Sequence, residues 1–303
     1  MTRDVTILKS VAMVMAVLFA IAGTLTLVFR HKDWGRNMGQ ATASWAVICA
    51  LFLLAPFAGF APFAAVMATI AILAVKEFYR MTGICRSLRL VVSAVFIVAM
   101  AAAVASGQVL LFHRFALLAV VVMFVVHAWR FSYEDIARTV ALQVVGLIYW
   151  GWQLLYWLLL QRLNGGYGLI LTLCAMIVVN DNGAFFFGKL FGRNSPKLAP
   201  RISPNKTWVG FGGGVLCSVL VAWGFGFALP HLSLAQRLVL GLVVGVAVPV
   251  GGLIESAFKR DAGVKDSGTL IPGHGGVMDR FDSWAFSAPI TYFLMRAFAC
   301  YPF

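Results

Sequence analysis

The chain has 303 residues, of which 61% are hydrophobic and only 12% are charged, and its mean hydropathy is +0.91. A soluble domain carries roughly 25% charged residues, so this composition excludes a soluble fold and indicates several passes through a membrane. The net charge of +13 is distributed in a way that favours a membrane surface over nucleic acid. Five scattered cysteines form no CxxC or Cys/His cluster, so neither a disulfide framework nor a zinc site is predicted.

Hydrophobic runs long enough to cross or enter a bilayer follow one another along the chain. The first, over residues 10–29, is longer than a signal-peptide core and lacks a clear cleavage site, so we interpret it as a retained span. The later runs cover residues 44–57, 60–75, 90–105, 109–127, 140–160, 167–188, 208–229, 238–258 and 284–299. The second and third are short and could form one re-entrant pair. We expect an all-α polytopic membrane protein, a bundle of about 8–10 transmembrane helices with a polar cavity open to the cytoplasm.

Positive charges gather in alternate connections between these runs. The connections after the first, third, fifth, seventh and ninth runs hold most lysines and arginines, whereas those on the other side hold only Arg114, Arg162 and Arg237. This asymmetry follows the positive-inside rule and predicts that the basic connections face the cytoplasm, above anionic lipid. We expect a multi-pass protein of a bacterial inner membrane with a cytoplasmic active face and no nucleic-acid partner. The sequence leaves open whether it forms a homodimer.

Residues 256–282 form the most polar stretch of this apolar chain, with four cations and four aspartates around a glycine-rich turn. Carboxylates among cations, with flexible backbone between them, are suited to holding a metal ion together with phosphate groups. The simplest alternative is a solvated loop between two spans. Such close alternation of charge with so many glycines favours the phosphate and metal interpretation.

Asp181 stands inside the seventh run, about 12 Å from its cytoplasmic end at ~1.5 Å per residue. An ionised carboxylate at that depth costs several kcal/mol unless it is paired or bound to a cation. The flanking Asn180 and Asn182 offer further oxygen ligands. A metal site and a structural ion pair are both compatible with this position.

The loop 189–207 carries five cations and the hydroxyl groups of Ser203 and Thr207, which could bind a polyphosphate or could simply follow the positive-inside rule. The glycine run that follows, 210–214, is not a Walker loop, and close helix packing is its better interpretation. Glu77 ends the third run near Arg80 and is interpreted as structural. Glu255 could pair with Lys259 one helical turn later, and His274 alone does not indicate acid–base catalysis.

The chain resembles the phosphatidate cytidylyltransferases, or CDP-diacylglycerol synthases, in two blocks of residues. The residues that carry the resemblance in the polar stretch are Ser256, Lys259, Arg260, Lys265, Asp266, Pro272, His274, Gly275, Gly276, Asp279, Arg280 and Asp282. A second block runs from Asp181 through residues 184–188 to residues 203–208. The firm resemblance covers about the C-terminal 40% of the chain, so we divide the protein into N-terminal transmembrane helices (1–165) and a C-terminal catalytic region (166–303).

The resemblance implies that the protein transfers CMP from CTP to phosphatidic acid with Mg²⁺, giving CDP-diacylglycerol and pyrophosphate for phospholipid biosynthesis; a second cation is left open. The implied metal ligands are Asp181, Asp279, Asp266 and Asp282. The implied catalytic residues are Asp279, Asp266, Lys265, Arg280 and His274, the last donating to the departing pyrophosphate. The implied phosphate and substrate contacts are Ser203, Lys206, Thr207, Ser256, Lys259 and Arg260. CTP, phosphatidic acid and the lipid bilayer are the expected partners.

Two positions depart from the family pattern. Asn205 stands where many relatives have a lysine, and Val209 where many have a glutamate. The second change removes a carboxylate next to the expected phosphate-binding residues, so it bears on nucleotide fit or lipid preference.

Two other functions remain as alternatives. A CTP-dependent kinase of lipid alcohols such as polyprenols would give its γ-phosphate to the lipid and release CDP. A transporter would use Asp181 as an ion site, but it should then carry charges deep in several spans, whereas the other acids crowd one face.

Overall fold

The computed structural model describes residues 5–10, 47–130, 135–268 and 275–298. Within these ranges the chain is mostly helical, as the sequence predicted. The first predicted span, over residues 10–29, lies almost wholly outside the described residues, so its retention and the total number of spans stay predictions.

Seven helices in the described part of the chain are long and apolar enough to cross a membrane, which confirms a polytopic membrane protein. They are α3 (Phe60–Met81), α4 (Ser87–Ala105), α5 (Val109–Arg130), the continuous helix Ile136–Arg162, α8 (Gly166–Phe191), α9 with its 3-10 extension (Trp208–Phe227) and α10 (Leu234–Asp261). The helix Ile136–Arg162 is built from α6 (Ile136–Gly146), the π-helical segment η1 (Leu147–Trp152) and α7 (Tyr156–Arg162). A shorter helix, Val47–Ala58, precedes α3, and α11 (Met278–Ala297) follows α10.

The ends of these helices follow from local sequence. Gly59 separates helix Val47–Ala58 from α3 with a φ of 125°, which only glycine adopts readily. Ser233 and Gln236 form a capping box at the start of α10, where each side chain accepts a hydrogen bond from the other residue's backbone N–H. The break at Gly59 confirms that the second and third predicted runs are separate helices.

The predicted helix boundaries are wrong at two places that matter for function. α3 continues to Met81, beyond the predicted run 60–75, so Glu77 lies inside the helix and not at its end. α11 begins at Met278, six residues before the predicted start, and carries Asp279 in its first turn. Charged residues in a membrane protein resemble a loop by composition, but here Phe281 and Trp284 on the same helix are buried in the core and hold the polar turn in helical form.

One element in the described residues is not helical. The loop between α8 and α9 contains an antiparallel hairpin of β1 (Lys197–Ala199) and β2 (Ser203–Thr207). Lys197 lies opposite Thr207, and Ala199 opposite Ser203. The all-α prediction is confirmed for the spans, and this short hairpin in the basic loop 189–207 was not predicted.

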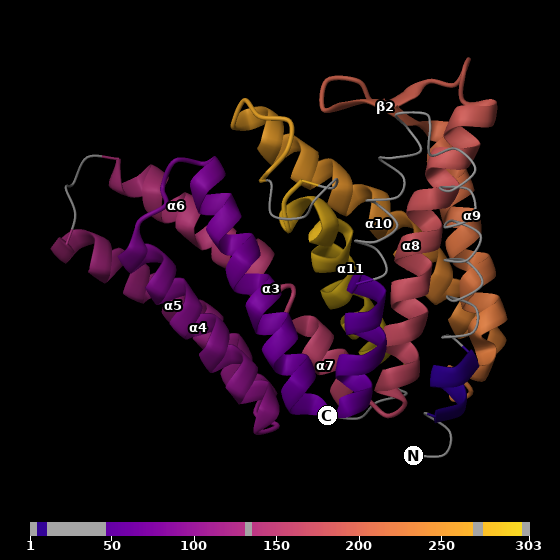
Figure 1. Cartoon of the computed structure of the whole chain (residues 1–303), viewed down its shortest axis with the longest axis horizontal. Coiled ribbons are helices and arrows are strands. Elements are labelled where there is room, and N and C mark those ends of the chain that lie inside the picture. The colour runs from indigo at the N-terminus through magenta and orange to yellow at the C-terminus, as the bar shows by residue number, and fades with distance from the viewer. Residues whose placement is uncertain (1–4, 11–46, 131–134, 269–274, 299–303) are drawn as a thin grey trace.

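The helices form two groups with a pair of helices between them (Figure 1). α3, α4 and α5 lie together on one side, α8, α9 and α10 lie on the other, and α7 and α11 run between them. Aromatic side chains fill this centre. The ring of Phe52 lies 4.4 Å from that of Trp284, and Trp157 donates its indole N–H to the Trp284 carbonyl at 3.2 Å. This core fixes α11 against α7 and against the helix Val47–Ala58.

Small residues bring α8, α9 and α10 close together. A Cβ built on Gly213 would clash with the Phe187 ring, and one on Gly214 would lie 2.8 Å from Oδ1 of Asn180. Asn180 itself donates to Ser218 on α9 at 2.9 Å and to the Gly245 carbonyl on α10 at 3.0 Å. The predicted packing role of the glycine run is confirmed. These contacts lock three helices together below the polar end of the molecule.

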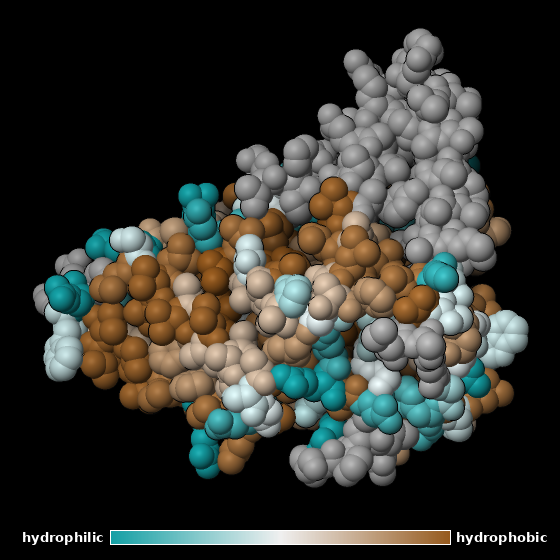
Figure 2. Space-filling view, turned by 60° about the horizontal axis from the view of Figure 1, so that its bottom comes forward, coloured by the Kyte–Doolittle hydropathy of each residue, from teal (hydrophilic) through white to brown (hydrophobic). Residues whose placement is uncertain are grey.

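The outer surface of the described helices is apolar. α4 exposes Val91, Val95 and Val98, and α5 exposes Leu117 and Val121 among others. Figure 2 shows a broad hydrophobic surface over the side where these two helices lie. Large apolar side chains exposed over most of a helix length are expected where lipid tails surround the protein.

Candidate active site

The candidate site is assembled where α8, the hairpin, α10 and α11 meet, at the upper end of the molecule in Figure 1. The two blocks that carry the family resemblance, residues 181–208 and residues 256–282, both reach this end. Arg260, at the end of α10, donates its Nε to the Ile202 carbonyl of the hairpin at 3.4 Å and its Nη1 to the Val264 carbonyl at 3.2 Å. The structure therefore brings residues 189–207 and 256–282 together, as the shared site requires.

Asp279 is the hydrogen-bonding centre of the polar stretch. Its Oδ1 accepts from Lys259 at 2.8 Å. Its Oδ2 accepts from the backbone N–H of Gly276 at 2.7 Å and from both the N–H and the hydroxyl of Ser267 at 3.0 Å. Because Gly275 has a φ of 82°, the chain can turn tightly enough to point these donors at one carboxylate. Asp279 thus fixes the segment before α11 onto the end of α10.

Glu77 supports this arrangement from α3. The side chain is only 7% exposed, and its Oε2 accepts from the Met278 N–H at 3.0 Å and from the Ser267 hydroxyl at 3.3 Å. The carboxylate satisfies a backbone N–H at the start of α11, where negative charge is favoured. The prediction of a structural residue at Glu77 omitted this link. Its partners lie about 200 residues away, and no local spacing indicates them.

Lys259 bridges two carboxylates. Its Nζ lies 2.9 Å from Oε1 of Glu255 and 2.8 Å from Oδ1 of Asp279. The predicted pairing of Glu255 with Lys259 is therefore present, with Asp279 as a third member. One ammonium is thus shared by two acidic side chains.

A second cluster brings together Asp181, Lys206, Arg280 and Asp282. Asp181 on α8 interacts electrostatically with Asp282 and Arg280 on α11 and with Lys206 of β2. Asp282 also interacts with Lys206 and Arg280. Two cations from other elements thus favour the charged form of Asp181, and they act against its burial and the charge of Asp282.

Gly252 of α10 makes room for this second cluster. A Cβ at that position would lie 2.7 Å from Nζ of Lys206 and 3.1 Å from Oδ2 of Asp282. The other oxygen of Asp282 accepts from the Ser283 N–H at 2.6 Å, and the Ser283 hydroxyl donates to the Val248 carbonyl on α10. Asp282 is consequently held with Oδ2 directed toward Lys206. The role of Gly252 was not predicted from the sequence.

Asn180 and Asn182 do not extend the cluster. Asn180 is buried between α8, α9 and α10, and Asn182 donates to the Val178 carbonyl of its own helix at 2.7 Å. Neighbours on a helix point about 100° apart, so residues on either side of Asp181 face other elements. The expectation that both amides add ligands beside Asp181 has no support in this geometry.

The remaining predicted residues occupy several environments. Thr207 is buried and caps α9 by accepting from the Gly210 N–H at 3.1 Å. Ser256 donates to the Gly252 carbonyl of its own helix, and Ser203 is half-buried in β2. Lys265 and Asp266 are exposed in the segment after α10. His274 lies outside the described residues, so its predicted role stays a prediction.

Asp181 and Asp282 are the candidate carboxylates for a metal site in this cluster. The described residues contain no group of three or more His, Cys, Asp or Glu side chains able to hold a metal on their own. Asp181 on α8 and Asp282 on α11 repel each other electrostatically. Mg²⁺ is usually bound through one or two carboxylates together with substrate phosphates, and this pair meets that requirement.

Comparisons with known proteins identify the family of the chain. The chain matches the profile of the cytidylyltransferase family over residues 39–298. The chain belongs to the cytidylyltransferase family. This match spans both the N-terminal helices and the polar end, so the family assignment covers the whole described bundle.

Three relatives are 39% to 42% identical to this chain over the matched region. The chain is 39% identical over 170 residues to a phosphatidate cytidylyltransferase of Staphylococcus epidermidis, covering 55% of this chain and 61% of that protein. It is 42% identical over 158 residues to a phosphatidate cytidylyltransferase of Bacillus subtilis, covering 50% and 56%. It is also 39% identical over 170 residues to the uncharacterized protein YnbB of Escherichia coli, covering 53% and 56%. The matched region thus spans a little over half the length of these relatives.

Proposed function

We propose that this protein transfers CMP from CTP to phosphatidic acid, forming CDP-diacylglycerol and releasing pyrophosphate. The observation that carries the proposal is the meeting of Asp181, Lys206, Arg280 and Asp282 from three separate elements in one charged cluster. Paired carboxylates with adjacent cations are what a Mg²⁺-nucleotide needs. The relatives in Staphylococcus epidermidis and Bacillus subtilis, which are named phosphatidate cytidylyltransferases, support the same reaction.

In the proposed reaction a phosphate oxygen of phosphatidic acid attacks the α-phosphorus of CTP. The new P–O bond joins the lipid phosphate to CMP, and the bond to the β-phosphate breaks so that pyrophosphate leaves with its electron pair. The attacking oxygen is already ionised near neutral pH, so the protein needs no strong general base. Positioning and neutralisation of charge are then the main contributions of the chain.

We assign Lys206 and Arg280 to the phosphates of the two substrates, because both cations face the Asp181–Asp282 pair. Asp181 and Asp282 would hold Mg²⁺, which neutralises phosphate charge when bound. Asp279 could join them through Oδ1, the oxygen that now faces Lys259. In its present arrangement Lys259 is neutralised by two carboxylates, and we assign it to positioning of Asp279.

The remaining predicted residues complete the proposal. We propose that Lys265 and Asp266, exposed in the segment after α10, approach the pyrophosphate part of CTP, with Ser203, Ser256 and Arg260 at the edge of the site. CTP arrives from water and the lipid from the bilayer, so we place the site in a polar cavity at the cytoplasmic membrane surface. The positive-inside distribution supports that side.

Product analysis tests the proposal. Purified protein in detergent is given Mg²⁺, phosphatidic acid and CTP labelled at the α-phosphate, and parallel reactions use γ-labelled CTP with an added polyprenol. Label from the α-position should enter the lipid fraction, and chelation of the metal should stop the transfer. Transfer of γ-label to the polyprenol without α-label in the lipid would instead establish the kinase.

A further inference from the structure

A second polar hollow lies apart from the candidate active site, among the ends of α3, α4, α5 and α6. It is a cavity of about 440 Å³, and the residues that line it are Thr82, Gly83, Ile84, Arg86, Arg89, His127, Arg130, Asp135, Arg138 and Thr139. This volume is in the range of small-molecule sites, roughly 300–1,000 Å³. None of these residues belongs to the polar stretch 256–282 or to the hairpin. The proposed transfer reaction therefore leaves this cavity without a role.

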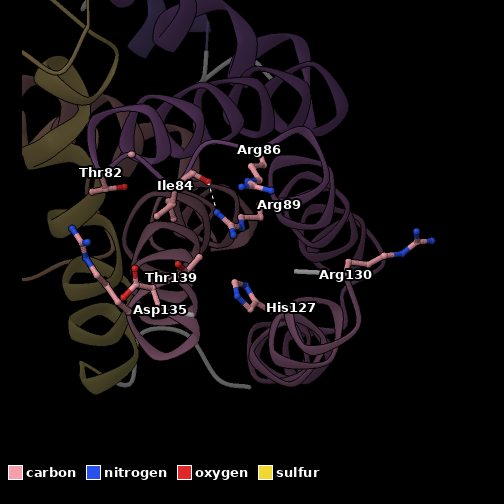
Figure 3. Close-up of a pocket in the computed structure, with 10 residues that line it drawn as sticks. Thr82, Ile84, Arg86, Arg89, His127, Arg130, Asp135 and Thr139 are labelled. Atoms are coloured by element: carbon pink, nitrogen blue, oxygen red, sulfur yellow. Dashed lines mark hydrogen bonds between the residues drawn. The ribbon is translucent and has the colours of Figure 1, made fainter. Parts of the chain in front are cut away.

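The cavity is strongly basic. Among the described residues, four arginines line it against one aspartate, and two of its basic side chains are buried, Arg89 at 8% and His127 at 2% exposure. Figure 3 shows Arg86, Arg89 and His127 directed toward the same space between the helices. Arg89 donates Nη1 to the Ile84 carbonyl at 3.0 Å, which holds the guanidinium in place.

Like charges meet in this cavity at a cost. The guanidinium groups of Arg86 and Arg89 oppose each other electrostatically, and burial of Arg89 adds to the unfavourable energy. The cavity also adjoins the start of α6, whose N-cap Asp135 makes no side-chain capping hydrogen bond. The partial positive charge of that helix end adds to the field of the arginines. An anion with several acceptor oxygens would be attracted into this field.

The location of the cavity favours a lipid as the source of the anion. Trp129 on α5 is 85% exposed directly beside Arg130, and exposed tryptophans concentrate at the boundary between membrane and water. The neighbouring Phe124 and Val125 are also exposed, as lipid-facing residues should be. The cavity therefore opens at the level of the lipid headgroups, at the same end of the bundle as the candidate active site (Figure 1).

We propose that the cavity lined by Arg86, Arg89 and His127 is a binding site for the phosphate group of an anionic lipid, separate from the site of CMP transfer. Arginine suits this ligand because its planar guanidinium can donate two hydrogen bonds to one phosphate. Thr139 adds a hydroxyl and the α6 end adds backbone donors. A free phosphate ion would make the same hydrogen bonds to the arginines. The experiment below distinguishes a bound lipid from a bound phosphate ion.

The test is native mass spectrometry of the full-length protein in neutral detergent with phosphatidylglycerol, phosphatidylcholine or inorganic phosphate. Phosphatidylglycerol is chosen because it is not the proposed substrate. The protein should retain phosphatidylglycerol in preference to phosphatidylcholine, and Arg86→Gln and Arg89→Gln should each weaken retention about fivefold. Arg193→Gln removes the same charge from an exposed position at the same end and should leave retention unchanged.

The outcomes separate the sources of the phosphate. Retained phosphatidylglycerol that depends on Arg86 supports the lipid. Bound inorganic phosphate that depends on Arg86, without lipid retention, supports the phosphate site with a free ion as ligand. Arg86 is exposed, so its variant should fold even if the variant of buried Arg89 does not, and thermal unfolding checks both. Equal retention by the Arg86 variant and the wild type, or binding of neither ligand, would overturn the proposal.

Discussion

Replacing Glu77 by alanine should disable the site without touching the substrates. Glu77 accepts from the Met278 N–H at 3.0 Å and from the Ser267 hydroxyl at 3.3 Å, and Ser267 in turn donates to Asp279. Hydrogen bonds to a charged group contribute about 1.5–3 kcal/mol, so alanine should remove about 2–3 kcal/mol of the free energy that holds this segment in place. If transfer requires the ordered segment, the rate should fall about 30- to 150-fold.

The assay is the initial rate of CMP transfer at varied CTP and phosphatidic acid, with thermal unfolding measured in parallel. Because Glu77 acts through Ser267 and Met278, kcat should fall more than either KM rises. Glu77→Gln keeps an acceptor oxygen and should restore most of the activity, whereas the exposed Arg80→Gln on the same helix should have little effect. A Glu77→Ala protein with normal kcat would refute the positioning role, and a Glu77→Gln protein as inactive as alanine would show that acceptor geometry is not what matters.

Three further changes probe the charged cluster and the hairpin. Gly252→Ala should lower transfer about tenfold with little loss of stability, because its Cβ would lie 2.7 Å from Nζ of Lys206 and 3.1 Å from Oδ2 of Asp282; full activity would contradict the close approach. Asp282→Asn should raise the Mg²⁺ concentration for half-maximal transfer, and an unchanged Mg²⁺ titration would remove Asp282 from the proposed metal site. Thr207→Ala should lower the free energy of unfolding by about 1 kcal/mol while Thr207→Ser preserves it, and equal stability of the two variants would argue against the cap.

The membrane architecture was accessible from the sequence because bilayer thickness imposes a length on every span. The run 109–127 became α5, and the run 90–105 became α4, with shifts of a few residues at the ends. The start of α11 was not accessible in this way. Asp279 resembles a loop residue by composition, and only the burial of Phe281 and Trp284 shows why the polar turn is helical.

The residue types of the site were also predictable, but the contacts that each residue makes with other helices were not. Spacing placed Glu255 beside Lys259 on one helix face, and the structure contains that ion pair. Spacing could not show that Lys259 also binds Asp279, or that Glu77 reaches Met278 from another helix. Such contacts depend on how α3, α10 and α11 pack, which a single sequence does not encode in any local pattern.

The central claim is that Asp181 and Asp282, from the two separate blocks, serve one reaction. The most direct test is transfer of α-phosphate label from CTP to phosphatidic acid by the wild type, Asp181→Asn and Asp282→Asn, with thermal unfolding as a control for folding. The account predicts that wild type moves the label into lipid and that each folded variant loses about 100-fold or more of the rate, as removal of a metal ligand should. Transfer at the wild-type rate by either folded variant would contradict the shared site.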